Sequence, residues 1–167
     1  MRLIISLSFL FFSVLTNAQN NPFSFIPTNL SATFYGQAQI NGIEADSNDW
    51  IAAFDTSGNC AGASQIINFN SQGYINLVIY GDDPVTPNID EGITGNEDFF
   101  IKIYDASENL YLDFPTYDSI ISFTGWSNTN GAPLSLYNNP NTIYNFTYTP
   151  VYLNFSDSII CTTDDSI

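Results

Sequence analysis

The sequence has no histidine and only two basic residues, Arg2 and Lys102, against 17 Asp and Glu residues. Without histidine, the chain lacks the usual acid–base group at neutral pH and the commonest zinc ligand. Without a cluster of basic residues, it has nothing to neutralise phosphates, which argues against binding to nucleic acid or to an anionic membrane. The formal charge of −15 therefore argues against anionic binding partners.

Charged residues are also scarce, at 11% of the 167 residues, whereas aromatic residues make up 16%. A disordered acidic tail would be poor in aromatic residues, so this composition predicts a folded domain with a core of its own. A Ser-His-Asp or Cys-His catalytic system is impossible without histidine. With 17 acids, a chance pair of carboxylates is easy to find and is no specific sign of a glycosidase. We therefore expect a protein that is not an enzyme.

The start of the chain has the pattern of a secretory signal peptide. A short basic start at Arg2 precedes an apolar run over residues 3–15, and small and polar residues follow at 16–19. The run is shorter than the roughly 20 residues that a spanning helix needs. No cysteine follows it directly, which argues against a lipoprotein anchor. We expect residues 1–19 to be removed, and the mature chain to be secreted or held at the cell surface with no membrane insertion.

The remainder alternates between apolar and polar residues with period two, as half-buried strands do. In the clearest run, Ala32, Phe34, Gly36, Ala38 and Ile40 share one face, whereas Ser31, Thr33, Tyr35, Gln37 and Gln39 share the other. Similar runs cover residues 75–79, 99–104 and 110–114. Turn signals separate the runs at 41–42, 55–59 and 105–109.

This pattern predicts an all-β fold, an antiparallel β-sandwich of roughly eight to ten strands. We expect the sandwich to span residues 20–150. Residues 151–167 would form a C-terminal tail or the start of a following segment.

Six short segments carry a resemblance to a known module, in the order GQAQING (36–42), DWIAAFD (49–55), GNCAG (58–62), IYGDD (79–83), GNE (95–97) and IKIYDAS (101–107). This order resembles the "IGAFD–G–C–G" hairpin followed by "GDD…GE…F…D" of an extracellular β module. That module occurs in secreted, type IX-exported multidomain proteins of Bacteroidota-type bacteria. The resemblance spans about residues 29–114.

The resemblance implies an extracellular module without established chemistry, often beside other modules and a C-terminal sorting domain. The sequence shows no sorting domain, which leaves open a fragment or another export route. The expected partners are a cell-surface or extracellular polymer, or neighbouring modules.

An acidic segment at residues 81–98 is the sharpest local feature. Asp82, Asp83, Asp90, Glu91 and Glu97 fall within it. Ca²⁺ takes six to eight oxygen ligands, often from such loops, so these residues are candidate metal ligands and Ca²⁺ is the candidate cofactor. The spacing is not that of an EF-hand. The alternative is a solvated loop that maintains solubility.

A second acidic group, Glu44, Asp46 and Asp49, precedes Trp50. It either joins the first group in space or keeps a turn hydrated.

Two tryptophans and two cysteines complete the candidates. Trp126 opens a segment rich in Gly and Asn, and its ring could stack on the apolar face of a sugar, which makes it the candidate ligand-binding residue. Trp50 begins an apolar strand and is expected in the core.

In an exported protein Cys60 and Cys161 could pair as a disulfide. A partner beyond residue 167, or two free thiols, are the alternatives.

From these observations we expect a secreted, non-catalytic β-sandwich module for adhesion, surface display or substrate binding. The alternative is an accessory carbohydrate-binding module that uses exposed aromatic residues.

Overall fold

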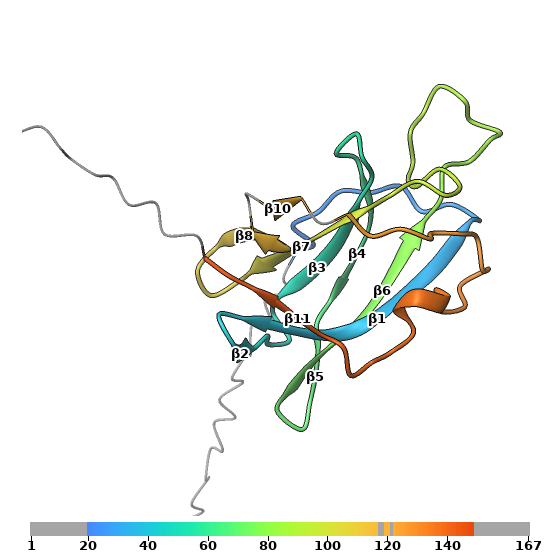
Figure 1. Cartoon of the computed structure of the whole chain (residues 1–167). Helices are drawn as coiled ribbons and strands as arrows, with labels where there is room; N and C mark the ends of the chain where they lie inside the picture. The colour runs from blue at the N-terminus through green and yellow to red at the C-terminus, as the bar shows by residue number, and fades with distance from the viewer. Residues whose placement is uncertain (1–19, 117–118, 121, 149–167) are drawn as a thin grey trace, which may run out of the picture.

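The computed structural model describes residues 20–116, 119–120 and 122–148, which form an all-β sandwich (Figure 1). The predicted fold class is confirmed, with one sheet of five strands and one of four. The predicted signal peptide, the segment 151–167 and Cys161 lie outside the described residues.

The five-stranded sheet has the order β11–β1–β6–β5, and β2 pairs with the end of β1. The four-stranded sheet has the order β4–β3–β7–β8. The strands of the first sheet are β1 (Ser31–Ile40), β2 (Ile43–Glu44), β5 (Ile67–Phe69), β6 (Gln72–Tyr80) and β11 (Ile143–Phe146). Those of the second are β3 (Trp50–Phe54), β4 (Cys60–Gln65), β7 (Phe100–Asp105) and β8 (Leu110–Asp113). The short strands β9 (Pro115–Thr116) and β10 (Ser119–Ile120) pair with each other, and η1 (Ser135–Tyr137) is a 3₁₀ turn.

One pair of strands departs from the predicted antiparallel pattern, because β11 runs parallel to β1. Parallel neighbours need a long connection, and here it is residues 41–142, which include strands β2 to β10. Its last part, the Gly- and Asn-rich segment 126–142, already runs beside β1 before β11 begins, since Leu134 N donates to Thr33 O at 2.9 Å. The edge of β1 is therefore covered along most of its length.

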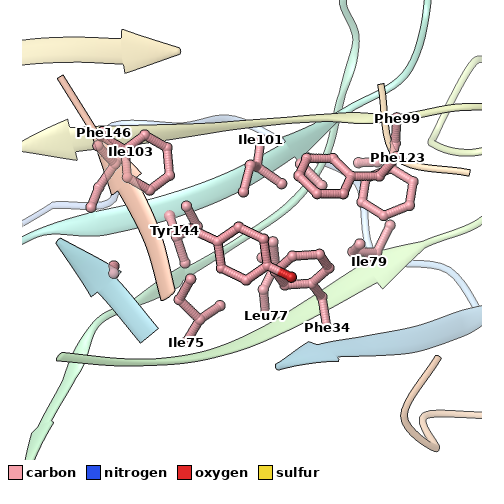
Figure 2. Close-up of a cluster of buried hydrophobic side chains, with 14 of the residues drawn as sticks. Phe34, Ile75, Leu77, Ile79, Phe99, Ile101, Ile103, Phe123, Tyr144 and Phe146 are labelled. Atoms are coloured by element: carbon pink, nitrogen blue, oxygen red, sulfur yellow. The ribbon is translucent and has the colours of Figure 1, made fainter. Parts of the chain in front are cut away.

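The core lies between the inward faces of the two sheets. Phe34 of β1 and Leu77 of β6 are fully buried from one side, and Ile101 and Ile103 of β7 from the other. Figure 2 shows these side chains pointing toward one another. The ring of Phe34 lies 5.1 to 6.1 Å, centroid to centroid, from a set of aromatic neighbours that close the core: Phe99, Phe123, Tyr137 and Tyr144. The period-two pattern thus fills the space between the sheets.

Two glycines allow close approaches that a side chain would block. At Gly36, a Cβ would lie 2.4 Å from the ring of Tyr144. At Gly62, where φ is +150°, a Cβ would lie 2.2 Å from the carbonyl oxygen of Val78. The edge of β4 therefore lies close to the backbone of β6, and the two sheets meet along this side.

The turns behave as the sequence predicts. Asn41 and Gly42 have φ values of 51° and 78°, the left-handed conformation that a tight two-residue hairpin requires. They connect β1 directly to β2.

Candidate functional site

The acidic segment is a loop between β6 and β7 that is anchored at its base. Asp82 N donates to Ile93 O at 3.1 Å, and Ile93 N donates to Tyr80 O at 2.9 Å. Ile93 is 1% exposed and belongs to the core. The predicted acidic residues thus lie in a loop whose base is closed by backbone hydrogen bonds at Ile93, a core residue.

The five predicted metal ligands fall into two groups in this loop. In the first group, Glu91 accepts hydrogen bonds from Thr86 Oγ1 at 2.5 Å and from Asp83 N at 3.3 Å. Asp82 Oδ1 accepts from Glu91 N at 3.4 Å, and Asp83 Oδ1 accepts from Val85 N at 2.9 Å. These carboxylates therefore hold the turns of their own loop.

The second group joins Asp90 and Glu97 to the turn between β3 and β4. The amide of Asn59 donates to the carbonyl and the carboxylate of Asp90, at 2.8 and 3.3 Å. Glu97 accepts from the amide of Thr56 at 3.2 Å and from its hydroxyl. Asp55, 2% exposed, stands beside Asp90. The β3–β4 turn is in this way attached to the acidic loop.

The pKa values of these carboxyls shift in opposite directions. Partial burial and the nearby negative charge of Asp55 raise the pKa of Asp90. Burial and the neighbouring Glu91 carboxyl raise the pKa of Asp82. For Glu97, burial acts upward, but hydrogen bonds from Thr56 and Thr94 outweigh it and lower the pKa. The charged forms of Asp90 and Asp82 therefore lower the stability of the fold, whereas the charged form of Glu97 raises it.

Metal binding by the predicted set stays a prediction. Within residues 20–116, 119–120 and 122–148, no three Asp, Glu or Cys side chains form a group that could hold a metal ion. Lys102, the sole basic residue in that part of the chain, pairs with Asp113 at 2.5 Å and neutralises neither acidic group of the loop.

The second acidic group, Glu44, Asp46 and Asp49, joins the β7–β8 turn and not the acidic loop. These residues line a cleft of about 280 Å³ together with Asp105 and Glu108.

The carboxylates of this cleft are also occupied. Asp49, 4% exposed, accepts from Ala106 N and from Asp46 N, both at 2.9 Å. Asp105, 6% exposed, accepts from Ser107 N at 2.9 Å and from Tyr148 Oη at 2.5 Å. Burial raises the pKa of Asp49, whereas for Asp105 the Tyr148 and Ser107 hydrogen bonds outweigh burial and lower it. The cleft is built from groups that brace two turns.

The prediction that Trp126 is an exposed stacking residue is wrong. Its side chain is 2% exposed and packs on Gly81, where a Cβ would lie 2.3 Å from Cη2 of the ring. The Gly- and Asn-rich flank suggested exposure, but the missing side chain at Gly81 makes room for the indole in the core. Trp126 also lines a cavity of about 390 Å³ beside Asp82 and Asn128.

Trp50 and Cys60 lie on the outer side of the four-stranded sheet. Trp50 is partly buried and packs with Phe54 and Tyr104 against a small cluster of Phe23, Ala52 and Cys60. Cys60 is 7% exposed, and burial raises the pKa of its thiol. Because Cys161 lies outside the described residues, the predicted disulfide stays a prediction.

The outer face of the five-stranded sheet brings together residues to which the sequence reasoning gave no role. On the central strands, Tyr35 lies opposite Asn76, and Gln37 lies opposite Tyr74. Ile67 of β5 pairs with Tyr74 on one side, and Ile143 of β11 pairs with Gln37 on the other. Ile67 and Ile143 are 49% and 52% exposed. The alternation along residues 31–39 already placed the β1 residues on one face, but sequence alone does not show which strands lie beside β1.

Among the described residues, this face carries one charged side chain, Glu44 of β2, which lies opposite Gln39 at a corner of the sheet. Its outward positions hold Ser, Thr, Tyr and Gln on β1, Gln, Tyr, Asn and Val on β6, Ile and Phe on β5, and Ile and Asn on β11. The carboxylate of Glu44 is engaged by Gln39 Nε2 at 2.6 Å and Gly73 N at 3.0 Å. In a chain with 17 acids, a sheet face with a single carboxylate at its corner is a distinct chemical surface.

The described residues contain no helix long and apolar enough to cross a membrane. No family model, curated protein or solved structure matches the chain.

Proposed function

We propose that this chain is a secreted, non-catalytic β-sandwich module that binds a cell-surface or extracellular polymer. The observation that carries the proposal is the outer face of the five-stranded sheet, whose central strands are uncharged and present tyrosine rings and amides between two edges with exposed isoleucines. A broad sheet face of this kind suits an extended partner better than a small molecule, since small-molecule sites are concave.

The carboxylates support a binding role over catalysis. The buried ones accept hydrogen bonds from backbone amides of the turns that they hold: Asp49, Asp55, Glu91 and Asp105. A general acid or base needs a proton that it can exchange with substrate, and these oxygens are committed to the fold. The chain also lacks histidine altogether.

Export is proposed from the sequence alone. The basic start, apolar run and small residues of positions 1–19 are the support, together with the resemblance of residues 29–114 to an extracellular module. The acidic, aromatic-rich composition fits a folded protein that is exported from the cell.

A Ca²⁺ ion at the acidic loop is part of the proposal. Its support is the acidic sequence of residues 81–98 and the closeness of Asp90 to Asp55, to which backbone carbonyls and water would have to add the remaining oxygen ligands. If Ca²⁺ binds there, millimolar Ca²⁺ raises the melting temperature of the wild type and leaves that of Asp90→Asn unchanged. If Ca²⁺ and EDTA change the melting temperatures of both proteins equally, the proposal that Ca²⁺ binds at this loop is wrong.

Co-sedimentation of the chain without residues 1–19 tests the function. The panel contains insoluble neutral polysaccharides, acidic polysaccharides, peptidoglycan and fibrous matrix protein, and the supernatants are assayed for soluble fragments. We expect at least one polymer to deplete the protein from solution with no release of fragments. Release of fragments would make the chain an enzyme, and no depletion by any polymer would contradict the binding role.

A further inference from the structure

We infer that the binding site of this module is the outer face of the five-stranded sheet, and that its ligand is a neutral polysaccharide. We call this surface the tyrosine–amide face and define it by Tyr35, Gln37, Gln39, Tyr74 and Asn76. The inference rests on the proposed function and assigns it a place and a ligand chemistry.

Tyrosine and amide side chains alternate across the paired strands β1 and β6. Tyr35 faces Asn76 and Tyr74 faces Gln37, so each ring stands beside an amide and the two rings are diagonal neighbours. Such diagonal positions in an antiparallel pair are roughly 7–8 Å apart. Both rings are partly exposed, and Asn76 is exposed. The two rings can therefore contact separate parts of one extended ligand.

Neighbouring side chains make this surface continuous. Gln37 is 5% exposed although it points outward, because Tyr74 and Ile143 flank it in the same row. Tyr74 Oη donates to Gln72 Oε1 at 2.6 Å, which fixes the ring over β6. A ring held in place loses little freedom when a ligand stacks on it.

The face is broad enough for a chain of sugars. It crosses four strands, β11, β1, β6 and β5, a width of roughly 14 Å at the usual strand spacing. Exposed Ile143 and Ile67 mark its two edges, and Phe69, 62% exposed, extends it along β5. The clefts near Asp49 and Trp126 lie elsewhere and share none of the defining residues.

The chemistry of the face selects a neutral, hydroxyl-rich partner. Aromatic rings pack against the apolar face of a sugar ring, and amides both donate to and accept from hydroxyls. A polycation would prefer the carboxylates elsewhere, and the charge of −15 repels a polyanion. A neutral polysaccharide would contact the two rings and the exposed amide of Asn76 together.

Native affinity electrophoresis provides the test, with the full chain lacking residues 1–19. The gels contain xyloglucan, mixed-linkage β-glucan, galactomannan or dextran as neutral polymers, and alginate as the anionic one. The variants are Tyr74→Ala, Tyr35→Ala and the conservative Tyr74→Phe. The matched control is Tyr111→Ala, since Tyr111 is 55% exposed but belongs to β8 of the other sheet. Circular dichroism and melting curves check that each variant is folded.

We expect retardation by at least one neutral polymer and none by alginate. Tyr74→Ala and Tyr35→Ala should each weaken binding by about tenfold, and Tyr74→Phe should weaken it less, because it keeps the ring and loses only the hydrogen bond to Gln72. Tyr111→Ala should bind like the wild type. Retardation that survives in folded Tyr74→Ala would place the site elsewhere and overturn the inference.

Two further outcomes separate the inference from the proposed function. If the chain sediments only with a protein or an acidic polymer, the binding function stands and the neutral ligand is wrong. If gel filtration shows a concentration-dependent dimer that Tyr74→Ala abolishes, the face is an interface between copies of the chain and the inference also fails.

Discussion

Tyr74 of β6 lies directly opposite Gln37 of β1, on the side of the sheet that faces away from the core. The same register places Tyr35 opposite Asn76, so the outward face of the central pair alternates rings and amides without a charge. The carboxylates gather instead at the two ends of β3 and β7, with Asp55 near the acidic loop and Asp49 near Asp105. Most of the negative charge of the described residues therefore lies away from the proposed binding surface, and Glu44, bonded to Gln39, is the carboxylate at its corner.

Gly62→Ala should destabilise the sandwich strongly. The new Cβ would lie 2.2 Å from Val78 O, and φ at this position is +150°, so backbone must move where β4 meets β6. Overpacking of this kind costs about 1–3 kcal/mol. Urea denaturation measures the loss in free energy of unfolding. The matched control is Gly95→Ala, where a Cβ meets nothing within 4 Å. Equal stability of the two variants would contradict the close packing of β4 on β6.

Glu97→Gln should weaken the fold at neutral pH and have less effect in acid. The folded state lowers the pKa of Glu97 below 4.5, so its anion stabilises the protein above pH 4.5, and this stabilisation is lost as the pH falls through the folded-state pKa. Melting temperatures of wild type and variant should differ most at pH 7 and converge below pH 4.5. A constant difference across that range would show that the charge of Glu97 is irrelevant to its contact with Thr56.

Asp90→Asn should have the opposite effect and raise the melting temperature at pH 7 in EDTA. The folded state raises the pKa of Asp90 above 3.8, so its contribution is favourable below pH 3.8 and is lost as the pH rises through the folded-state pKa. Removing the charge relieves the repulsion from Asp55 and keeps an oxygen for Asn59. The gain should vanish below pH 3.8. A lower melting temperature at pH 7 would mean that the Asp90 charge supports the loop.

Alternation along the sequence was sufficient to predict the sandwich and both faces of β1. Phe34 and Ala38 point inward and Tyr35 and Gln37 outward, as the period of two requires. The Asn41–Gly42 hairpin was also predictable, because the left-handed turn favours those two residues. These features depend only on local spacing.

The candidate sites depend on strand neighbours that local spacing does not reveal. The turn after β3 reaches Asp90 and Glu97, through Asn59 and Thr56, because β3 pairs with β7, far apart along the chain. The outer face is assembled only when β6 and β11 flank β1. Trp126 was misjudged for a related reason, since its space in the core is provided by Gly81, a residue remote in sequence.

An NMR titration of the ¹⁵N-labelled chain with an oligosaccharide from a polymer that retards it tests the central claim most directly. Our account predicts chemical-shift changes centred on the outward positions of β1 and β6, with Tyr35, Gln37, Tyr74 and Asn76 among the largest, and smaller changes at Ile67 and Ile143. Changes confined to residues 81–98, or to the cavity beside Trp126, with the sheet face unaffected, would contradict it.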